Sequence, residues 1–272
     1  MSLQETKSLL QDHRIVPNTL LGQNFIVDPS IFPKLSEYAS LNSNDVVLDA
    51  GAGFGFLTRF IANKCNAVVA VEKDPRVVEV LREQLKALTN VTIVEGDVLK
   101  VAVPDFNKAV SIPPYYLSSH LMMWLLDRSF KCALLILQKE FAGRLIATVG
   151  TENYGWLNVV TYHRVEVELL DTIPNWMFHP QPKVDSVIVR LKPWTASPFS
   201  VKDEALFKRL VRWLFTQRNK KLGNAVVPFI KIDRKVDKLE AEKIACDLPL
   251  RDKRVRELSP KDFGALADAL VN

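Results

Sequence analysis

The feature that most constrains the fold is a strand-then-helix pattern that occurs twice in succession. DVVLDAGAGFGFLTRFIANK (45–64) and AVVAVEKDPRVVEVLREQLKAL (67–88) each begin with a short apolar strand and continue as an amphipathic helix. Three more short apolar strands follow, in VTIVEGD (91–97), KAVSI (108–112) and CALLILQ (132–138). Strands that alternate with helices at this spacing predict a parallel sheet covered by helices. We therefore expect a Rossmann-like α/β fold.

The last quarter of the chain differs from the rest in charge and in periodicity. From VKDEALFKRLVRWLF (201–215) onward the apolar residues recur at helical spacing. Residues 201–272 contain 17 Lys and Arg against 11 Asp and Glu, whereas residues 1–200 contain 19 against 20. A positive excess confined to one segment predicts a surface for a polyanion. We expect a first domain over 1–195 and a small basic helical domain over 196–272.

The sequence also predicts the last strands of the first domain and a location for the chain. VEVELLDTI (165–173) and SVIVRLKP (186–193) indicate an antiparallel pair at one edge of the sheet. No apolar run reaches the ~20 residues of a membrane span, and the N-terminal segment lacks a signal-peptide core, so we expect a cytoplasmic protein. Cys65, Cys132 and Cys246 have no CxxC spacing, which predicts reduced core thiols and no metal site.

Residues of a ligand-binding type follow three consecutive strands. Gly51 and Gly53 stand between a strand and a helix, where glycine lets the backbone approach a ligand closely. Glu72 ends the next strand, where a carboxylate can accept hydrogen bonds from a ribose diol. Asp97 ends the third and can meet the amine of an adenine. Each alone is more often an ordinary polar strand end, but together they predict a nucleoside cofactor, either NAD or S-adenosylmethionine.

The fourth strand ends in SIPPYYLSS (111–119), which separates these two cofactors. Proline fixes its φ and cannot donate to a sheet, so the chain leaves the strand in a preset turn. The turn resembles the [N/D/S]-[I/L/P]-P-[Y/F] turn of amino-group methyltransferases, and nothing downstream is typical of hydride transfer. We therefore expect S-adenosyl-L-methionine. Carbonyls of the turn can accept hydrogen bonds from an adenine N6 amine, and Tyr115 can stack on an unpaired base.

Two further motifs extend the resemblance to nearly the whole chain. They are LLGQNFIVD (20–28) and NWMFHPQPKVDSVIV (175–189). Together with LDAGAGFGFLT, AVEKDP, EGDVL and FTQRNKKLGNAV, they resemble the rRNA adenine N6,N6-dimethyltransferases of the KsgA type, from about Leu21 to RVRELSPKDFGALADAL. The resemblance implies a methyltransferase domain followed by a helical RNA-binding domain. It also implies dimethylation of adenosines, two adjacent ones in the family, in small-subunit rRNA.

The resemblance also implies partners and site residues. The partner would be small-subunit rRNA in a pre-30S-type particle during ribosome biogenesis, bound by a monomer without metal or membrane. The implied cofactor contacts are Gln23, Asn24, Ile26, Gly51, Gly53, Glu72, Asp97, Val98 and Ser111. The implied catalytic turn and base-stacking residues are Ile112, Pro113, Pro114, Tyr115 and Phe178. The implied RNA contacts are Lys183, Arg212, Arg218, Lys220 and Lys221.

One position departs from the family's pattern. The family usually has Asn-Leu-Pro-Tyr or Asn-Ile-Pro-Tyr, and here Ile112 occupies the Asn place. Isoleucine offers no acceptor to N6, and Ser111 stands one residue early, which turns it to the other face of a strand. Ser111 could serve, backbone carbonyls could serve alone, or transfer could be weak, as in an rRNA-binding assembly factor. A large-subunit rRNA methyltransferase or a protein-glutamine methyltransferase is a further alternative, and FHPQPKVDS disfavours the latter.

Overall fold

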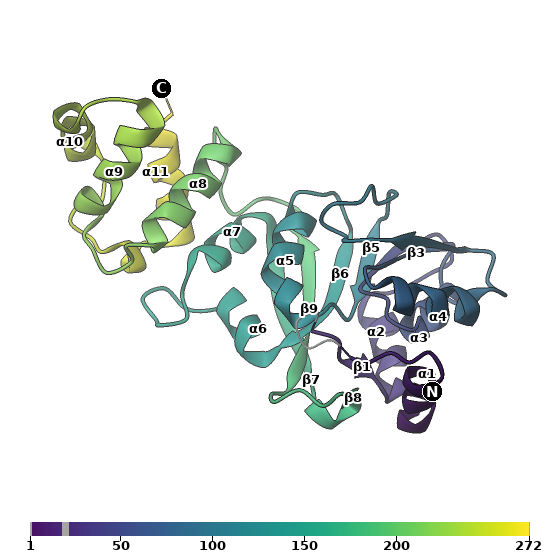
Figure 1. Cartoon of the computed structure of the whole chain (residues 1–272). Helices are drawn as coiled ribbons and strands as arrows, with labels where there is room; N and C mark the ends of the chain where they lie inside the picture. Colours follow the sequence, from purple (N-terminus) through teal and green to yellow (C-terminus); the bar gives the residue numbers. More distant parts are fainter. Residues whose placement is uncertain (1, 18–21, 272) are drawn as a thin grey trace. The chain divides into compact units, whose positions relative to one another are not determined.

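The computed structural model describes residues 2–17 and 22–271, and the chain forms two compact units (Figure 1). Unit 1 comprises residues 1–142 and 167–193, and unit 2 comprises 143–166 and 194–272. The first two residues of the LLGQNFIVD motif lie outside the described residues.

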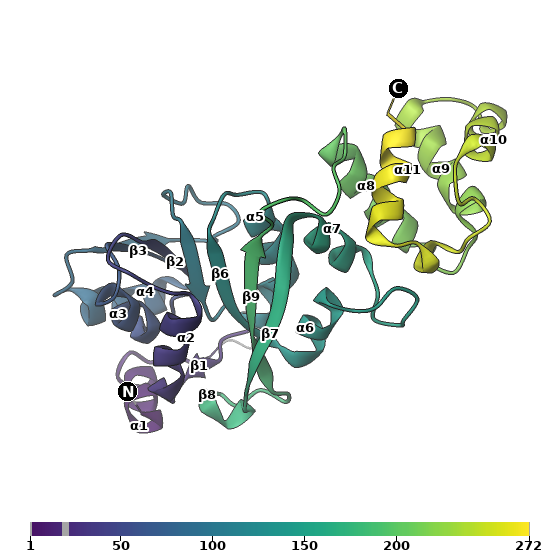
Figure 2. The same cartoon turned by 180° about the vertical axis from the view of Figure 1, so that it is seen from behind.

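The centre of unit 1 is a seven-stranded sheet (Figure 2). In spatial order its strands are β4 (Val91–Glu95), β3 (Ala67–Glu72), β2 (Val46–Ala50), β5 (Lys108–Ser111), β6 (Cys132–Gln138), β9 (Ser186–Pro193) and β7 (Val165–Ile173). The strands from β4 to β6 pair in parallel, and β9 pairs antiparallel with β6. The parallel Rossmann-like sheet is thus confirmed, and β9 and β7 lie side by side at one edge as expected.

Helices supply the apolar surface that buries this sheet. In unit 1 they are α1 (Leu3–Asp12), α2 (Phe32–Tyr38), α3 (Phe56–Ala62), α4 (Pro75–Leu85) and α5 (Ser118–Leu126), with short 3-10 turns η2 (Pro29–Ile31) and η3 (Tyr115–Leu117). Phe32 of α2 and Ile61 of α3 share one buried cluster with Val47 and Val110 of the sheet. Strands buried in this way are near-continuous apolar runs, which is why the sequence predicted them.

A small second sheet joins two segments that are far apart in the sequence. β1 (Phe25–Ile26) pairs antiparallel with β8 (Phe178–His179), so that Phe25 lies opposite His179 and Ile26 opposite Phe178. The turn η4 (Asn175–Met177) leads into β8, and the Val27 N–H donates to the Met177 carbonyl at 2.8 Å. The GQNF and FHPQP motifs therefore lie next to each other.

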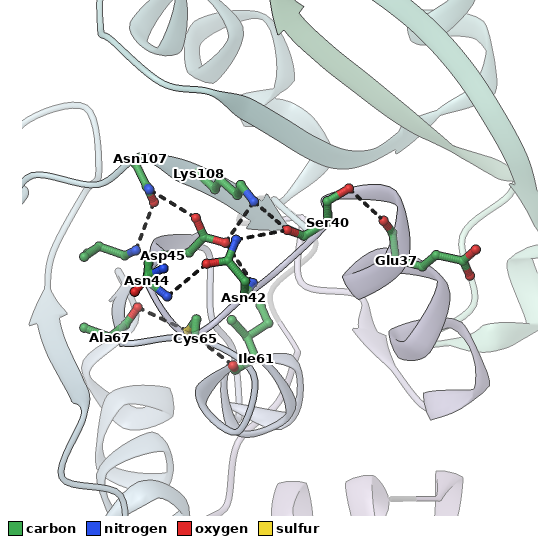
Figure 3. Close-up of polar contacts among 11 residues, drawn as sticks. Glu37, Ser40, Asn42, Asn44, Asp45, Ile61, Cys65, Ala67, Asn107 and Lys108 are labelled. Atoms are coloured by element: carbon green, nitrogen blue, oxygen red, sulfur yellow. Dashed lines mark hydrogen bonds and ion pairs between the residues drawn. The ribbon is translucent and has the colours of Figure 1, made fainter.

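A buried ion pair lies at the amino-terminal edge of the sheet (Figure 3). The Lys108 ammonium, at the start of β5, is 2.8 Å from the carboxylate of Asp45, just before β2. Asp45 also accepts hydrogen bonds from the Asn107 amide (3.1 Å) and the Asn42 N–H (2.9 Å), and Lys108 donates to the Ser40 carbonyl (2.7 Å). A buried charge is tolerated when it is paired and hydrogen-bonded in this way.

Unit 2 is helical. Its elements are α7 (Trp156–Arg164), α8 (Glu204–Phe215), α9 (Leu222–Arg234), α10 (Lys238–Asp247), the 3-10 turn η5 (Val255–Glu257) and α11 (Pro260–Ala269), and α6 (Lys139–Leu145) ends in it. The buried Tyr154 hydroxyl donates to the Leu258 carbonyl at 2.8 Å, and α7 packs on α8. The packing thus groups 143–166 with the C-terminal helices, whereas the sequence placed this segment in the first domain, because it lies between two sheet strands in the chain.

The sequence predicted reduced core thiols, no metal site and no membrane-spanning segment. Cys65 and Cys132 are buried free thiols, whereas Cys246 on α10 is exposed and does not belong to a core. Burial raises the pKa of the Cys65 thiol to about 11. Across residues 2–17 and 22–271, no helix is long and apolar enough to cross a membrane. In the same residues no three His, Cys, Asp or Glu side chains gather as they would around a metal ion.

Candidate active site

A pocket opens in unit 1 at the carboxyl edge of the parallel strands. Its walls come from segment 22–25, the glycine turn after β2, the end of β3, the proline turn after β5, and β8. The carboxyl edge of an open α/β sheet is where ligands bind in this class of fold. The pocket is therefore the candidate active site.

The pocket gathers most, but not all, of the predicted cofactor and catalytic residues. Those that line it are Gln23, Asn24, Gly51, Gly53, Glu72, Ile112, Pro113, Pro114, Tyr115 and Phe178. Those outside its lining are Ile26, Asp97, Val98 and Ser111. Ile26 and Val98 are buried in the protein interior. The Asp97 carboxylate is 3.2 Å from the Lys73 ammonium, and Lys73 does line the pocket.

Ser111 has a structural position instead. Its side chain is 1% exposed, and its hydroxyl accepts a hydrogen bond from the Ala50 N–H at 2.8 Å and donates to the Leu48 carbonyl at 3.3 Å. The β2–β5 ladder extends only to the Leu48–Ala109 pair, so the hydroxyl replaces ladder bonds beyond that point. The structure does not bring Ser111 to the pocket.

The glycine turn contacts the pocket walls through bare backbone. Gly51 and Gly53 have φ values of +81° and +56°, in the left-handed region that favours glycine. A Cβ on Gly51 would lie 2.7 Å from Cδ of Pro114, and one on Gly53 would lie 3.4 Å from the Phe25 ring. The Gly51 N–H donates to the Val71 carbonyl at 2.8 Å, which fixes the turn against β3. A side chain at Gly51 would therefore displace the proline turn after β5.

Glu72 is held firmly at the end of β3. Its carboxylate accepts hydrogen bonds from the backbone N–H groups of Gly53 (2.9 Å), Lys73 (2.7 Å) and Asp74 (2.9 Å). Burial raises the pKa of Glu72 above its usual value, and these bonds partly offset the increase. The Gln23 amide donates to Asp74 at 2.9 Å, which ties the N-terminal segment to this wall.

Asp49, which the sequence analysis did not single out, lies at the end of β2. It is 1% exposed, and one carboxylate oxygen accepts a hydrogen bond from the Thr58 hydroxyl at 2.7 Å. The other oxygen has no hydrogen-bond partner among the described residues. Burial raises the pKa of Asp49 to about 7, and the neighbouring charge of Glu72 adds to the increase. The signal in the sequence was an aspartate inside an otherwise apolar strand, immediately before the glycine turn.

The proline turn places two tyrosines at the pocket. The Tyr115 ring meets the Phe178 ring edge-on, with centroids 6.4 Å apart and planes at 65°. Phe178 is 2% exposed and belongs to the core, so it is a wall behind Tyr115 and not an open stacking surface. Tyr116 also lines the pocket and is 45% exposed. Tyr116 was not among the predicted site residues, although the doubled tyrosine of PPYY was visible in the sequence.

The lining fits a nucleoside cofactor. Glu72 offers a fixed carboxylate acceptor, and Gly51 and Gly53 offer backbone without side chains. Phe25 lines the pocket and stacks on Phe54 with ring centroids 4.2 Å apart, so this wall is rigid and apolar. A ligand with a ribose diol and a flat base therefore meets a fixed carboxylate acceptor and an aromatic wall in this pocket.

The predicted RNA-binding residues have different surroundings. In unit 2, the Arg212 guanidinium lies 4.6 Å from the centroid of the Trp156 ring. Arg218 donates to the carbonyls of Thr151 and Glu152, at 2.8 and 2.7 Å. Both arginines therefore hold the 143–166 segment of their own unit. Lys183 in unit 1 and Lys220 and Lys221 in unit 2 are exposed.

A second basic segment of unit 2, part of the C-terminal basic region that the sequence predicted to bind a polyanion, lies beside Lys220 and Lys221. The Leu222 N–H donates to the Lys253 carbonyl at 2.8 Å, and the Val255 N–H donates to the Lys220 carbonyl at 3.1 Å. Lys221 and Arg254 form a β-bridge. The exposed cations of these two segments form a basic strip, which consists of Lys220, Lys221, Arg251, Lys253 and Arg254.

Comparison with known proteins places this architecture in a family. The chain is 35% identical over 271 residues to a probable ribosomal RNA small subunit methyltransferase A from Methanosarcina acetivorans, with 98% of each chain covered. It is 38% identical over 257 residues to a protein of the same name from Thermococcus kodakarensis, covering 94% of this chain and 90% of the relative.

Solved structures agree with these sequence relatives. A dimethyladenosine transferase from Plasmodium falciparum matches with a TM-score of 0.75 and 28% identity, over 89% of this chain and 95% of that one. The 23S rRNA methyltransferase ErmE matches with a TM-score of 0.64 and 27% identity, over 91% and 99%. The family described as ribosomal RNA adenine dimethylase matches residues 16–259. The chain belongs to the ribosomal RNA adenine dimethylase family.

Proposed function

We propose that this protein dimethylates the N6 amines of adenosines in small-subunit rRNA, two adjacent ones, with S-adenosyl-L-methionine as methyl donor. It acts as a monomer on a ribosomal particle during ribosome biogenesis, in the cytoplasm. The observation that carries the proposal is the convergence of the glycine turn, Glu72 and the proline–tyrosine turn on one pocket in a chain of this family. The relatives named for small-subunit rRNA support the choice of subunit.

The pocket residues divide the work of holding the cofactor. S-adenosyl-L-methionine, when bound, supplies an electrophilic methyl group on a sulfonium. Glu72 accepts hydrogen bonds from the ribose diol, which its fixed orientation favours. Gly51 and Gly53 let the backbone approach the ligand, and Gln23 and Asn24 close the pocket from the N-terminal side. Asp97 and Val98, which lie outside the pocket lining, contact the adenine of the cofactor in this proposal.

Backbone carbonyls of the proline turn orient the target amine. The Pro114 carbonyl accepts from the Leu117 N–H at 2.9 Å, and the Tyr115 carbonyl accepts from the Ser118 hydroxyl at 2.8 Å. No hydrogen bond among residues 2–17 and 22–271 uses the carbonyl of Ile112 or Pro113. These two carbonyls remain available for the N6 hydrogens, which would favour a more tetrahedral nitrogen and stabilise its developing charge. Since Ser111 is engaged elsewhere, backbone acceptors replace the missing Asn.

A direct assay tests the reaction. The protein is incubated with undermodified small ribosomal subunits and labelled S-adenosyl-L-methionine, and the labelled adenosines are mapped by mass spectrometry. We expect N6,N6-dimethyladenosine at two adjacent positions. Tight binding of the subunit without transfer would support an assembly factor instead, and label in the large subunit would move the substrate to the other rRNA.

The Ile112→Asn variant tests the role of the carbonyls. Restoring the family's usual residue should leave the single-turnover rate unchanged or raise it, because an added side-chain acceptor duplicates what the backbone provides. A large fall in rate, with folding intact, would show that Ile112 itself shapes the pocket and that the carbonyl account fails.

The basic strip is the proposed surface for rRNA phosphates in unit 2. Lys220→Glu combined with Lys253→Glu should weaken rRNA binding and flatten its salt dependence by about two units of slope, because each lost phosphate contact removes about one. The control is Lys86→Glu combined with Lys131→Glu, two exposed lysines of unit 1 with the same change in charge. If the two pairs of substitutions weakened rRNA binding equally, the effect would come from the change in net charge, and the basic strip would not be a specific RNA-binding surface.

A further inference from the structure

The Tyr115 hydroxyl has a dedicated partner. It lies 2.7 Å from the hydroxyl of Ser186, which is fully buried at the start of β9. A buried phenol hydroxyl needs a hydrogen-bond partner. Here the partner and the tyrosine belong to two different elements of the fold. Tyr115 stands on the turn after β5, whereas Ser186 stands on the antiparallel strand beyond β6.

The Ser186 end of this bond is fixed on both sides. Ser186 pairs with Gln138 in the β6–β9 ladder. The preceding residue, Asp185, accepts a hydrogen bond from the Lys139 N–H through its carbonyl (3.1 Å) and from the Asn175 N–H through its carboxylate (2.9 Å). The backbone that carries the serine hydroxyl therefore has little freedom to follow the tyrosine if the ring moves.

The Tyr115 ring is thus fixed at both ends. At one end its backbone begins the 3-10 turn that Pro114 sets, and at the other its hydroxyl meets Ser186. Phe178 contacts the ring edge-on and limits rotation from the side. We propose that Ser186 is a positioning residue, which holds the plane of the Tyr115 ring for stacking on the target adenine.

This inference rests on the proposed function, because it assigns the orientation a role in methyl transfer. Stacking stabilises a base only when the two planes are nearly parallel, so a ring free to tilt holds the N6 amine less often in the reactive geometry. The loss should therefore reduce the rate of transfer from bound RNA, while RNA affinity, which many contacts share, changes little.

A double-variant cycle in single-turnover kinetics tests the assignment. Ser186→Ala and Tyr115→Phe each remove the same hydrogen bond and keep the ring. At saturating RNA each should lower the rate about 3- to 10-fold, as loss of one hydrogen bond predicts. The double variant should be no slower than either single one. Dissociation constants for RNA and for S-adenosylhomocysteine should stay within about twofold of the unmodified protein.

Tyr38→Phe is the matched control. It removes a phenol hydrogen bond to Asp171 (3.2 Å), also in unit 1, from a tyrosine outside the pocket lining, and should leave the rate unchanged. A purely structural role for Ser186 would lower thermal stability in Ser186→Ala and leave the rate unchanged. Rates within twofold of the unmodified protein, or effects that multiply in the double variant, would overturn the proposal.

A second readout does not require methyl transfer. In protein with ¹³C-labelled tyrosine rings, the Tyr115 signals are those lost in Tyr115→Phe. Ser186→Ala should shift and broaden them, because the ring samples more orientations, whereas Tyr38→Phe should not. Unchanged Tyr115 signals in Ser186→Ala would refute the positioning role. If the unmodified protein transfers no methyl group while the ring signals respond as expected, the proposed function fails and the Ser186 restraint stands.

Discussion

Two aspartates at opposite ends of the strand β2 have opposite environments. Asp45, just before the strand, is buried with Lys108, Asn107 and the Asn42 N–H as partners (Figure 3). Burial alone would raise its pKa, but these bonds outweigh burial and hold the pKa below its usual value. Asp49, four residues further along, has the Thr58 hydroxyl as its partner, and its pKa is raised to about 7.

The difference between the two aspartates distinguishes the amino-terminal edge of the sheet, which stabilises the fold, from the carboxyl edge, which borders the candidate active site. At the amino-terminal edge Asp45 is paired with Lys108, and Ser40 and Asn42 complete the network. At the carboxyl edge, Asp49 and Glu72 are two neighbouring carboxylates, both with raised pKa values. Neighbouring carboxylates with raised pKa values are typical of functional sites, where burial and like charges are arranged to shift pKa values.

The largest expected effect breaks the amino-terminal network. Lys108→Met would leave the Asp45 carboxylate buried without its counter-charge, and should lower the free energy of unfolding by about 3–5 kcal/mol. The double variant Asp45→Asn with Lys108→Met should recover part of that loss, because it leaves no buried charge. Urea unfolding measures both. A loss below about 1 kcal/mol in the single variant would show that water reaches Asp45.

An Asp→Asn substitution at each of the two aspartates should change the pH dependence of stability in a different way. The pKa of Asp49 is about 7 in the folded protein, whereas its ordinary value is 3.8. Between these two pH values the folded state therefore binds more protons than the unfolded state. Stability therefore falls as pH rises from about 4 to 7. Asp49→Asn, which keeps an acceptor for Thr58, should remove this slope and stabilise the protein at pH 8 by about 1–4 kcal/mol.

Asp45→Asn should act in the opposite direction. The pKa of Asp45 is lowered in the folded state, so its stabilising contribution is present above pH 4 and is lost as pH falls through the folded-state pKa. At pH 8 the Asn variant should be less stable than the unmodified protein. Unfolding curves at pH 5 and 8 measure both variants, and the same sign of change at pH 8 would mean that the two sites do not differ as described.

The parts of the site that the sequence predicted are those determined by local chain signals. The glycine turn, Glu72 and the PPYY turn could be placed because a strand end, a helix start and a proline fix the local backbone. The parallel sheet followed from alternating strands and helices. Gln23 and Asn24 came from the family resemblance, and the structure brings them to the same pocket.

The remainder depends on contacts between distant segments. The Ser111 hydroxyl bonds to β2, which no pattern in SIPPYY indicates. Residues 143–166 join unit 2 through contacts such as that of Tyr154, although the segment precedes a strand of the sheet. Arg212 and Arg218 look like RNA ligands in a basic run, yet their guanidinium groups hold their own unit. Charge in a sequence does not reveal which cations the fold already uses.

An intermediate effect is expected at the end of β3. Glu72→Gln removes the charge but keeps one oxygen acceptor, and should weaken binding of S-adenosylhomocysteine about 10- to 100-fold, since a hydrogen bond to a charged group contributes about 1.5–3 kcal/mol. The matched control is Glu95→Gln, because Glu95 lies opposite Glu72 at the end of β4 and pairs with Arg82. Titration calorimetry that finds equal affinity in all three proteins would remove Glu72 from the cofactor site.

The smallest expected effect concerns Ser111. It lies at the carboxyl edge of the sheet, but its hydroxyl makes hydrogen bonds that stabilise the fold, as the groups of the amino-terminal network do. Ser111→Ala leaves the Ala50 N–H without its acceptor, and should cost about 1–2 kcal/mol of stability. The single-turnover rate, measured well below the unfolding transition, should stay within twofold of the unmodified protein, because the hydroxyl does not reach the pocket. A rate that falls tenfold with little loss of stability would instead show that Ser111 turns toward the amine during the reaction, and the backbone carbonyls would then not act alone.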